Sequence, residues 1–270
     1  MASLMRAARE RGLRVYPVQC ALSAGGLRPG GILRQHPEWA LRDIEGHPLG
    51  TLSPANPEAR AWVASVSREI VATYQPDGLL LDYLRFPNQP VQLDPAAARN
   101  SPAPAPKASR EDKARFQTVR EDALTEQAHQ ISDAARSAKR GLRIAVYSWG
   151  PHVVKNHNVS QNWPLWAARG YIDNVNLSGY CFPESYGEKY LAVFEQRLAE
   201  ARKFNAPVEL TFALGIKTSH GGIRQAADVK GYLDIARRLG LRGTAVFTWG
   251  HLQPFLADFE RGSYLREFSR

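Results

Sequence analysis

Short apolar segments alternate with amphipathic segments along almost the whole chain of 270 residues. The apolar segments are typical of buried strands, whereas the segments between them carry apolar residues at helical spacing. Strands that take turns with helices in this way form parallel sheets joined by crossover helices. We expect six strands, at residues 13–19, 78–82, 142–148, 172–179, 208–214 and 243–249.

The clearest helix is predicted at residues 57–75. Asn56 can cap its first turn, Pro57 suits that turn, and an apolar stripe follows at Trp62, Val63, Val66, Ile70 and Tyr74. Other helices are expected at 2–11, 110–139, 163–169, 186–203 and 223–238, with a last one from about residue 253. Residues 88–110 are rich in Pro and Ala, and we expect a long surface loop without regular structure there. The pattern predicts one domain over residues 1–270 that carries this loop as an insertion.

The net charge of +9 would suit a polyanionic partner if it were gathered in one place. Arg and Lys are instead spread along the predicted helices, usually near Glu or Asp, which favours a solvated surface over nucleic-acid binding. No apolar run is long enough to span a bilayer. The start, MASLMRAARERG, has no apolar signal core, so the chain as written is expected to be cytoplasmic.

Several kinds of chemistry are not indicated. Cys20 and Cys181 have no metal-type spacing and are interpreted as free thiols. His152 and His157 are not spaced for joint metal binding on a helix. The chain has neither a phosphate-binding GxxxxGK[ST] or GxGxxG motif nor a GxSxG nucleophile elbow. We therefore expect no metal and no organic cofactor.

Polar and aromatic side chains follow the predicted strands. In parallel α/β folds the carboxyl ends of the strands form the working face. The side chains there include Asp82, Tyr83, Arg85, Trp149, Tyr180, Glu184 and Trp249. Flat rings stack on sugar rings and carboxylates bond to hydroxyls, so this set suits a carbohydrate.

Two stretches resemble a known family. They are HPEWALRDIEGHPLGTLSPANPEARAWVASVSREIVATYQPDGLLLDYLRFP and SQNWPLWAARGYIDNVNLSGY, and they are similar to the bacterial glycosyl-hydrolase-like barrel family, which is distantly like family 10 glycoside hydrolases. The resemblance covers residues 4 to about 250. It implies a (β/α)8 TIM-barrel-like fold and hydrolysis of a polysaccharide or of a peptidoglycan glycan strand.

The chain departs from this family at its beginning. Members carry further βα units before the first helix seen here, so we expect an incomplete barrel of about six strands that lacks the first one or two units. An upstream segment would then hold a signal peptide or lipoprotein anchor, and the protein would be exported or periplasmic.

Glycoside hydrolysis generally uses two carboxyl groups, one ionised and one protonated. Asp82 is the first candidate, as nucleophile or base, with Arg85 expected to keep it ionised. Its alternative role is to fix its own loop through backbone N–H groups. Glu184 is the candidate acid, because neighbouring aromatic rings would desolvate it; the alternative is a residue that stabilises a helix N-terminus.

Substrate contacts are predicted for aromatic and polar residues. Trp149 and Trp249 are candidates for sugar stacking, although each is as readily explained by core packing. Candidates for bonding sugar hydroxyls are Tyr83, Arg85, Tyr180, His36, Gln161 and Asn176, of which His36 is equally suited to pinning a turn. Trp62 and Trp166 are expected in the core.

The sequence thus predicts a glycoside hydrolase with a carbohydrate substrate. One alternative is a non-catalytic carbohydrate-binding barrel, a pseudoenzyme or truncated fragment, and another is a binder of anionic polymers driven by charge. The sugar, the linkage, the stereochemical outcome and the oligomeric state do not follow from the residues.

Overall fold

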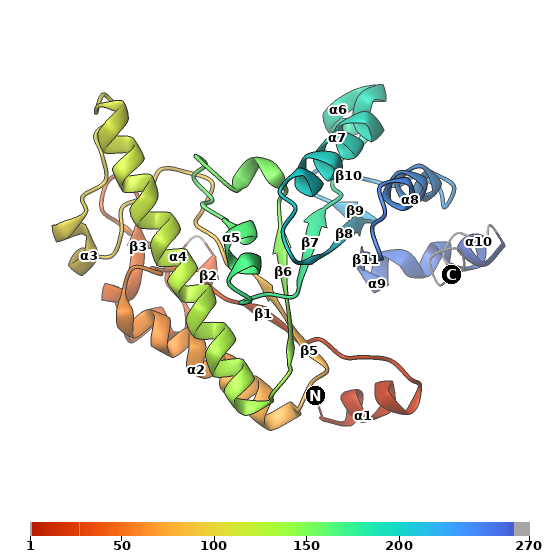
Figure 1. Ribbon diagram of the computed structural model, residues 1–270, viewed down its shortest axis with the longest axis horizontal. Helices are drawn as coiled ribbons and strands as arrows, with labels where there is room; N and C mark the ends of the chain where they lie inside the picture. Colours follow the sequence, from red (N-terminus) through yellow and green to blue (C-terminus); the bar gives the residue numbers. More distant parts are fainter. Residues whose placement is uncertain (1, 27, 262–270) are drawn as a thin grey trace. The chain divides into compact units, whose positions relative to one another are not determined.

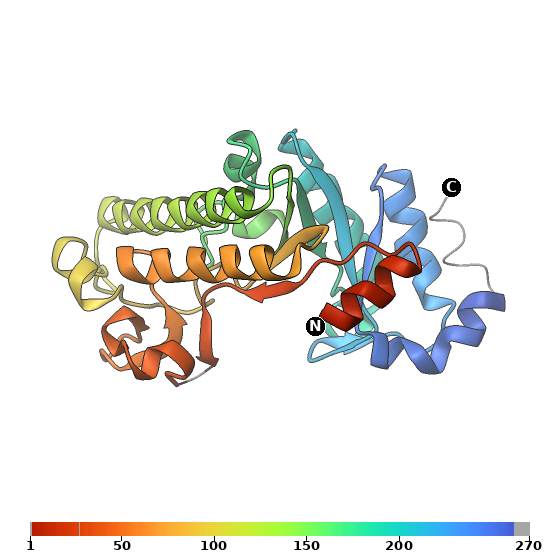
Figure 2. The same ribbon diagram turned by 90° about the horizontal axis from the view of Figure 1, so that it is seen from below.

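The computed structural model describes residues 2–26 and 28–261, which fall into two compact units (Figures 1 and 2). The first unit comprises residues up to Tyr147 together with Val153–Asp173, and the second comprises Ser148–His152 and the chain from Asn174 onward. The residues that follow Arg261 in the sequence lie outside the described part, including the end of the predicted last helix and of the predicted single domain.

Three parallel strands form the centre of the first unit. They are β1 (Val18–Cys20), β5 (Gly78–Asp82) and β6 (Arg143–Ser148), in the order β1-β5-β6. Leu80 pairs with Val18 on one side and with Ala145 on the other. Leu79 and Leu81 are fully buried, so the leucine triplet anchors the strand that presents Asp82.

Two long helices cover these strands. Helices α2 (Pro57–Tyr74) and α4 (Arg110–Ala138) run side by side in both views (Figures 1 and 2). The carboxamide oxygen of Asn56 accepts from the N–H groups of Glu58 and Ala59, which confirms the predicted cap. The face of α2 that is buried runs through Ala59, Val63, Ser67 and Val71, so the predicted stripe is displaced: Trp62, Val66, Ile70 and Tyr74 are only half-buried.

The rest of the first unit differs from the sequence-based prediction in two places. An antiparallel sheet of β2 (Ser23–Gly26), β4 (Pro48–Leu52) and β3 (Ala40–Arg42), in the order β2-β4-β3, was not expected. The Pro/Ala-rich segment contains α3 (Pro95–Asn100), whose first turn is capped by the buried carboxylate of Asp94. The prediction of no regular structure at 88–110 is therefore wrong.

The unit also contains α1 (Ala2–Glu10), α5 (Trp163–Ala168) and the short 3-10 helices η1 (Gly31–Arg34) and η2 (Pro37–Trp39).

The second unit has three further parallel strands, β7 (Asn174–Ser178), β8 (Glu209–Gly215) and β11 (Thr244–Phe247), in the order β7-β8-β11. Helices α7 (Tyr190–Lys203) and α8 (Asp228–Arg238) connect them. Phe194, Phe212 and Tyr232 form an aromatic core, with the ring of Phe194 centred 5.1 Å from each of the other two. The shorter elements are η3 (Pro151–Val153), which begins in this unit, α6 (Pro183–Tyr186), η4 (Gly187–Lys189), β9 (Lys217–Thr218), β10 (Gly221–Gly222), α9 (Trp249–Leu252), η5 (Gln253–Phe255) and α10 (Leu256–Arg261).

The order of elements confirms the predicted fold class. In the described residues six parallel strands alternate with helices, near the six predicted ranges, as in a (β/α) barrel with fewer than its eight strands. Over the same residues, none of the helices combines the length and the apolar character that a bilayer crossing needs.

Candidate functional site

Asp82 is the last residue of β5 and lies in register with Cys20 of β1. Its backbone carbonyl accepts from the N–H of Ala21 at 2.8 Å, which fixes the strand end. Its carboxylate Oδ1 accepts from the N–H of the next residue, Tyr83, at 2.7 Å. Tyr83 has a φ of +52°, so the chain turns directly after the carboxylate.

Burial dominates the electrostatics of Asp82. It raises the pKa of the carboxyl above its usual range, while the N–H of Tyr83 and the charge of Arg85 oppose the shift. Arg85 thus acts in the expected direction, toward the ionised carboxylate, but burial outweighs its effect. Burial also lowers the pKa of Arg85 itself, against the opposing charge of Asp82. The guanidinium of Arg85 lies over the ring of Tyr83, 5.0 Å from its centre, so the three residues form one cluster.

Two other candidates of the first unit lie in structural positions. The ring of His36 stacks on that of Trp39 with centres 3.9 Å apart, and its Nδ1 lies 3.1 Å from a carboxylate oxygen of Glu38. The side chain of Gln161 is fully buried and donates to the carbonyls of Leu84 and Tyr147 at 3.3 and 2.9 Å. His36 thus pins a turn, and Gln161 ties the loop after β5 to the end of β6.

Glu184 lines a pocket of about 500 Å³ in the second unit, together with Lys217, Arg224 and His251. Its carboxylate lies 3.7 Å from the guanidinium of Arg224, and the Glu184 side chain is 44% exposed. The aromatic enclosure expected for this residue is therefore incomplete. The pocket nevertheless combines a carboxylate, two cations and an imidazole, and all of these groups can bond to the hydroxyl groups of a sugar.

Gly221 supports the position of Glu184. A β-carbon at residue 221 would lie 2.6 Å from Oε2 of Glu184 and 2.9 Å from the side chain of Phe182. Gly221 also has a φ of +131°, a conformation that side chains disfavour. Only glycine therefore lets the carboxylate lie against this turn.

Aromatic side chains gather near the carboxyl ends of β7 and β11. The ring of Tyr180 is centred 6.2 Å from that of Phe247 and 6.5 Å from that of His220. Trp249, at the start of α9, is 62% exposed and Phe247 is 49% exposed, so both rings are available to a ligand. Trp149 is half-buried.

Asn176 does not fit a sugar contact. It is 7% exposed, and its carboxamide oxygen accepts from the hydroxyl of Thr211 at 3.2 Å on the neighbouring strand. The side chains of Asn176 and Gln161 are both buried and bonded to the protein, so we do not propose them as substrate contacts.

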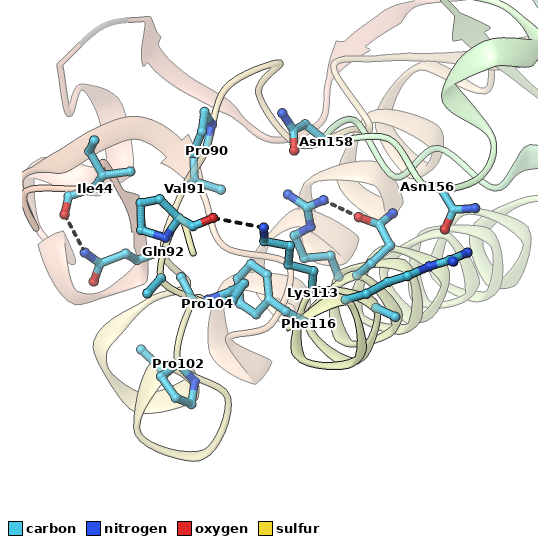
Figure 3. Close-up of a pocket in the computed structure, with 18 residues that line it drawn as sticks. Ile44, Pro90, Val91, Gln92, Pro102, Pro104, Lys113, Phe116, Asn156 and Asn158 are labelled. Atoms are coloured by element: carbon cyan, nitrogen blue, oxygen red, sulfur yellow. Dashed lines mark hydrogen bonds between the residues drawn. The ribbon is translucent and has the colours of Figure 1, made fainter. Parts of the chain in front are cut away.

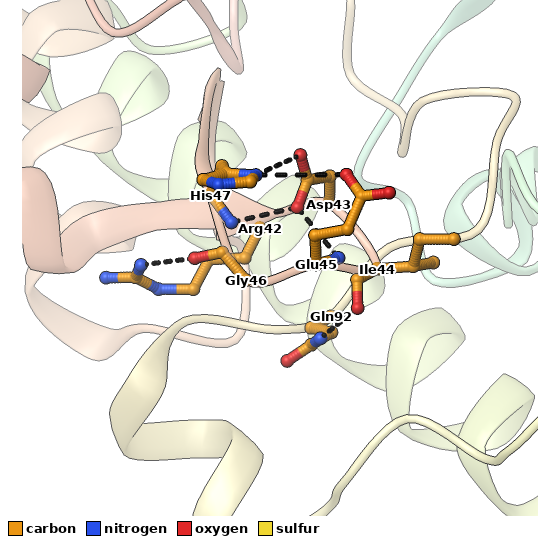
Figure 4. A network of polar contacts seen from close by, with 7 residues as sticks. All are labelled: Arg42, Asp43, Ile44, Glu45, Gly46, His47 and Gln92. Carbon is orange, nitrogen blue, oxygen red and sulfur yellow. Dashed lines mark hydrogen bonds and ion pairs between the residues drawn. The ribbon is translucent and has the colours of Figure 1, made fainter.

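One group of side chains has the types that bind a metal: Asp43, Glu45 and His47, in the turn between β3 and β4 (Figure 4). Oδ1 of Asp43 accepts from the N–H groups of Glu45 and His47 at 3.0 and 2.8 Å. The imidazole Nδ1 of His47 lies 3.2 Å from Oδ2 of Asp43. These hydrogen bonds stabilise an exposed turn, and they are sufficient to explain why the three side chains lie together.

Two residues that lie near Glu184 in this pocket, Arg224 and Gly221, were not predicted from the sequence. Arg224 follows Glu184 by forty positions and belongs to a different loop, so no local pattern links them. Gly221 lies in a run of two glycines between predicted elements, where glycine is unremarkable without knowledge of what packs on it. Asp173, which precedes β7, accepts from the N–H of Ile144 and pairs with Arg136 at 2.9 Å.

Six parallel strands that alternate with helices define a (β/α)-barrel-like protein. A family model described as Glycosyl hydrolase-like 10 matches residues 1–225, so the chain belongs to this family. The resemblance seen in the two sequence stretches is thereby confirmed. No curated protein matches the chain.

Solved structures show the same fold. The PgaB (BpsB) glycoside hydrolase domain from Bordetella bronchiseptica is 15% identical with a TM-score of 0.64, over 94% of this chain and 75% of that one. A β-galactosidase from Bacillus circulans sp. alkalophilus is 10% identical with a TM-score of 0.67, over 91% and 42%. An α-galactosidase from Thermus thermophilus is 15% identical with a TM-score of 0.57, over 98% and 52%. The chain thus spans about half or less of the two galactosidases, and at these identities the likeness concerns the fold alone.

Proposed function

We propose that this protein is a glycoside hydrolase that acts on a polysaccharide or a peptidoglycan glycan strand, with Asp82 and Glu184 as its carboxyl groups. The observation that carries the proposal is the half-buried Asp82 at the carboxyl end of β5 in a member of a glycosyl-hydrolase-like family. Such a position is where (β/α)-barrel enzymes place their catalytic residues. Tyr83, Arg85, Tyr180, Trp149 and Trp249 serve as substrate contacts in this proposal.

The electrostatics favour Asp82 as the group that carries the proton. A carboxyl whose pKa is raised by burial retains a proton closer to neutral pH, as a general acid requires. Glu184 is more exposed and pairs with the guanidinium of Arg224 at 3.7 Å. Glu184 is then the nucleophile or the base, the reverse of the roles expected from the sequence.

Hydrolysis by single variants tests this proposal. Release of reducing ends would be measured on peptidoglycan and on a panel of plant and bacterial polysaccharides for Asp82→Asn and Glu184→Gln. Exposed carboxylates provide the controls, Asp122→Asn and Glu188→Gln. We expect loss of at least about a hundredfold in the first pair and no change in the second. Full activity in Asp82→Asn would end the proposal.

Substrates with different leaving groups distinguish the general acid from the nucleophile or base. An aryl glycoside needs little protonation of its leaving group, so it should restore much of the activity of the acid variant and none of the nucleophile or base variant. We expect Asp82→Asn to be restored and Glu184→Gln not to be. The opposite pattern would return the roles to the sequence-based expectation.

A carbohydrate-binding protein without catalysis is the second candidate, and the exposed rings of Phe247 and Trp249 favour it. In that case wild type and Asp82→Asn would bind the same glycan equally well and neither would cleave it. Binding that falls steeply with salt and ignores Trp249 would instead indicate an anionic polymer as the partner.

A further inference from the structure

The first unit contains a cavity of about 1010 Å³ between the loop 88–109 and the first turns of α4 (Figure 3). Figure 3 shows Pro90, Pro102 and Pro104 of the loop around the same space as Lys113 and Phe116 of the helix. The lining is mostly apolar, from proline, alanine and phenylalanine. A volume of this size is large enough for a ligand of ordinary metabolite size. Neither Asp82 nor Glu184 lines it.

Arg120 lines this cavity and is 5% exposed. Its Nη2 donates to the side-chain oxygen of Gln117 and, at 3.5 Å, to the carbonyl of His157. Its Nε is buried and has no acceptor among the described residues. The guanidinium lies 5.6 Å from the ring centre of Phe86 and 5.5 Å from that of Phe116, so rings provide part of its surroundings.

The charge of Arg120 is not balanced by an ion pair within the described part of the chain. Burial lowers its pKa to about 10, and the guanidinium is still cationic at neutral pH. Glu121, whose charge acts on Arg120, is hydrogen-bonded to Gln117 at 2.7 Å and does not line the cavity. A buried cation without a carboxylate partner is costly unless a ligand supplies the anion.

The remaining charges of the cavity have the same sign. Arg110 and Lys113 line it as well, and no acidic side chain does so among the described residues. The ammonium of Lys113 donates to the carbonyl of Pro106 at 2.9 Å, which holds one cation beside the loop. The cavity therefore presents three cations on a largely apolar wall.

We propose that this cavity binds a small organic carboxylate, with its anionic group on Arg120 and its apolar surface against Phe116 and the loop prolines. A guanidinium is suited to a carboxylate because its N–H groups match the two oxygens. The carboxylate can belong to an aromatic acid or to a uronic acid, whose hydroxyls the carboxamides of Asn156 and Asn158 would bond. The site is separate from the proposed catalytic residues and does not depend on hydrolysis.

Binding of two probes tests the proposal directly. Calorimetric titration would use 2-naphthoate and digalacturonate, each against its neutral counterpart, 2-naphthylmethanol and galactobiose. We expect at least one acid to bind at least tenfold more tightly than its neutral counterpart. Naphthoate alone would identify an aromatic acid, and digalacturonate an acidic sugar. Equal binding of acid and neutral forms, or binding of neither acid, would overturn the proposal.

Arg120→Gln should weaken binding of the acid that the wild type binds at least tenfold, whereas Arg115→Gln should leave this binding unchanged. Arg115 is on the same helix, has a side chain that is 69% exposed and pairs with Glu111 and Asp112 outside the cavity. Unchanged binding by a folded Arg120→Gln variant would contradict the role of the guanidinium.

A second variant leaves Arg120 in place, since loss of a buried arginine can unfold the protein. Ala103 lines the cavity from the loop, and Ala103→Trp would fill part of the space. Ala96 of α3 is exposed and outside the lining, so Ala96→Trp is its control. We expect at least tenfold weaker binding for the first and wild-type binding for the second. Tight binding by Ala103→Trp would show that the acid binds elsewhere.

Discussion

Oε2 of Glu184 lies 2.6 Å from the point that a β-carbon on Gly221 would occupy. Glu184 belongs to helix α6 and Gly221 to strand β10 of the second unit, so the position of one constrains the other. The first prediction follows from this contact.

Gly221→Ala should displace the carboxylate of Glu184 and strain the backbone. The φ of +131° costs a non-glycine residue on the order of 1–3 kcal/mol of unfolding free energy. We expect that loss in urea unfolding, together with a reduced hydrolytic rate. Gly250→Ala is the control, because a β-carbon there meets nothing within 4 Å. Equal stability of the two variants would contradict the contact.

Asp82→Asn should change the pH dependence of stability. Because burial raises the pKa of Asp82 in the folded protein, the unfolded chain releases this proton first as the pH rises, and stability is lost between the two pKa values. We expect Asp82→Asn to gain stability relative to wild type as the pH rises from 3 to 7. Urea unfolding across that range measures the difference. Asp122→Asn, at an exposed position, should show no such trend.

Trp249→Ala should weaken glycan binding with little effect on folding. The side chain is 62% exposed, so we expect the unfolding free energy to change by less than about 0.5 kcal/mol. Trp166→Phe offers the contrast, because Trp166 is fully buried and its indole N–H donates to Thr125 at 3.0 Å. That variant should lose about 1–3 kcal/mol and keep its glycan affinity. A strong destabilisation by Trp249→Ala would show that the ring supports the core.

Gln161→Leu should destabilise the first unit and leave the glycan affinity of the folded protein unchanged. The substitution leaves the carbonyls of Leu84 and Tyr147 without their donor, at a cost of about 1–3 kcal/mol for each. Thermal unfolding would measure the loss, with the exposed Gln196→Leu as the comparison. Weaker glycan binding by Gln161→Leu, measured under conditions in which the variant is fully folded, would indicate that Gln161 contacts the substrate.

Local signals in the sequence predicted much of the fold. Asn56 followed by Pro57 marked the start of α2, and the leucine triplet marked β5. Asp94 followed by Pro95 is the same kind of start signal for α3, and it lies in the Pro/Ala-rich segment that was interpreted as a loop from its composition alone. The sheet of β2, β3 and β4 was missed because its strands are short, two of them contain glycine, and pairing between distant segments supports them.

The surroundings of the candidate residues were harder to predict from the sequence than the fold. The sequence placed Asp82 at a strand end, but the degree of burial that raises its pKa depends on segments packed around it. Arg120 occupies the same face of α4 as Phe116 and Leu124, four positions away on either side, so the helical period alone would have placed it inside. The absence of an ion pair for it in the described residues is a property of tertiary structure that no spacing reveals.

Helix α4 has 29 residues, a length of about 43 Å at 1.5 Å per residue. Its buried face extends from Phe116 to Ala135, while the side chains of residues 110–115 are exposed. Phe116 and Arg120, which line the proposed ligand cavity, therefore also begin the face that anchors the helix. A change in the loop before the helix would therefore reshape the proposed cavity and leave the strand that presents Asp82 as it is.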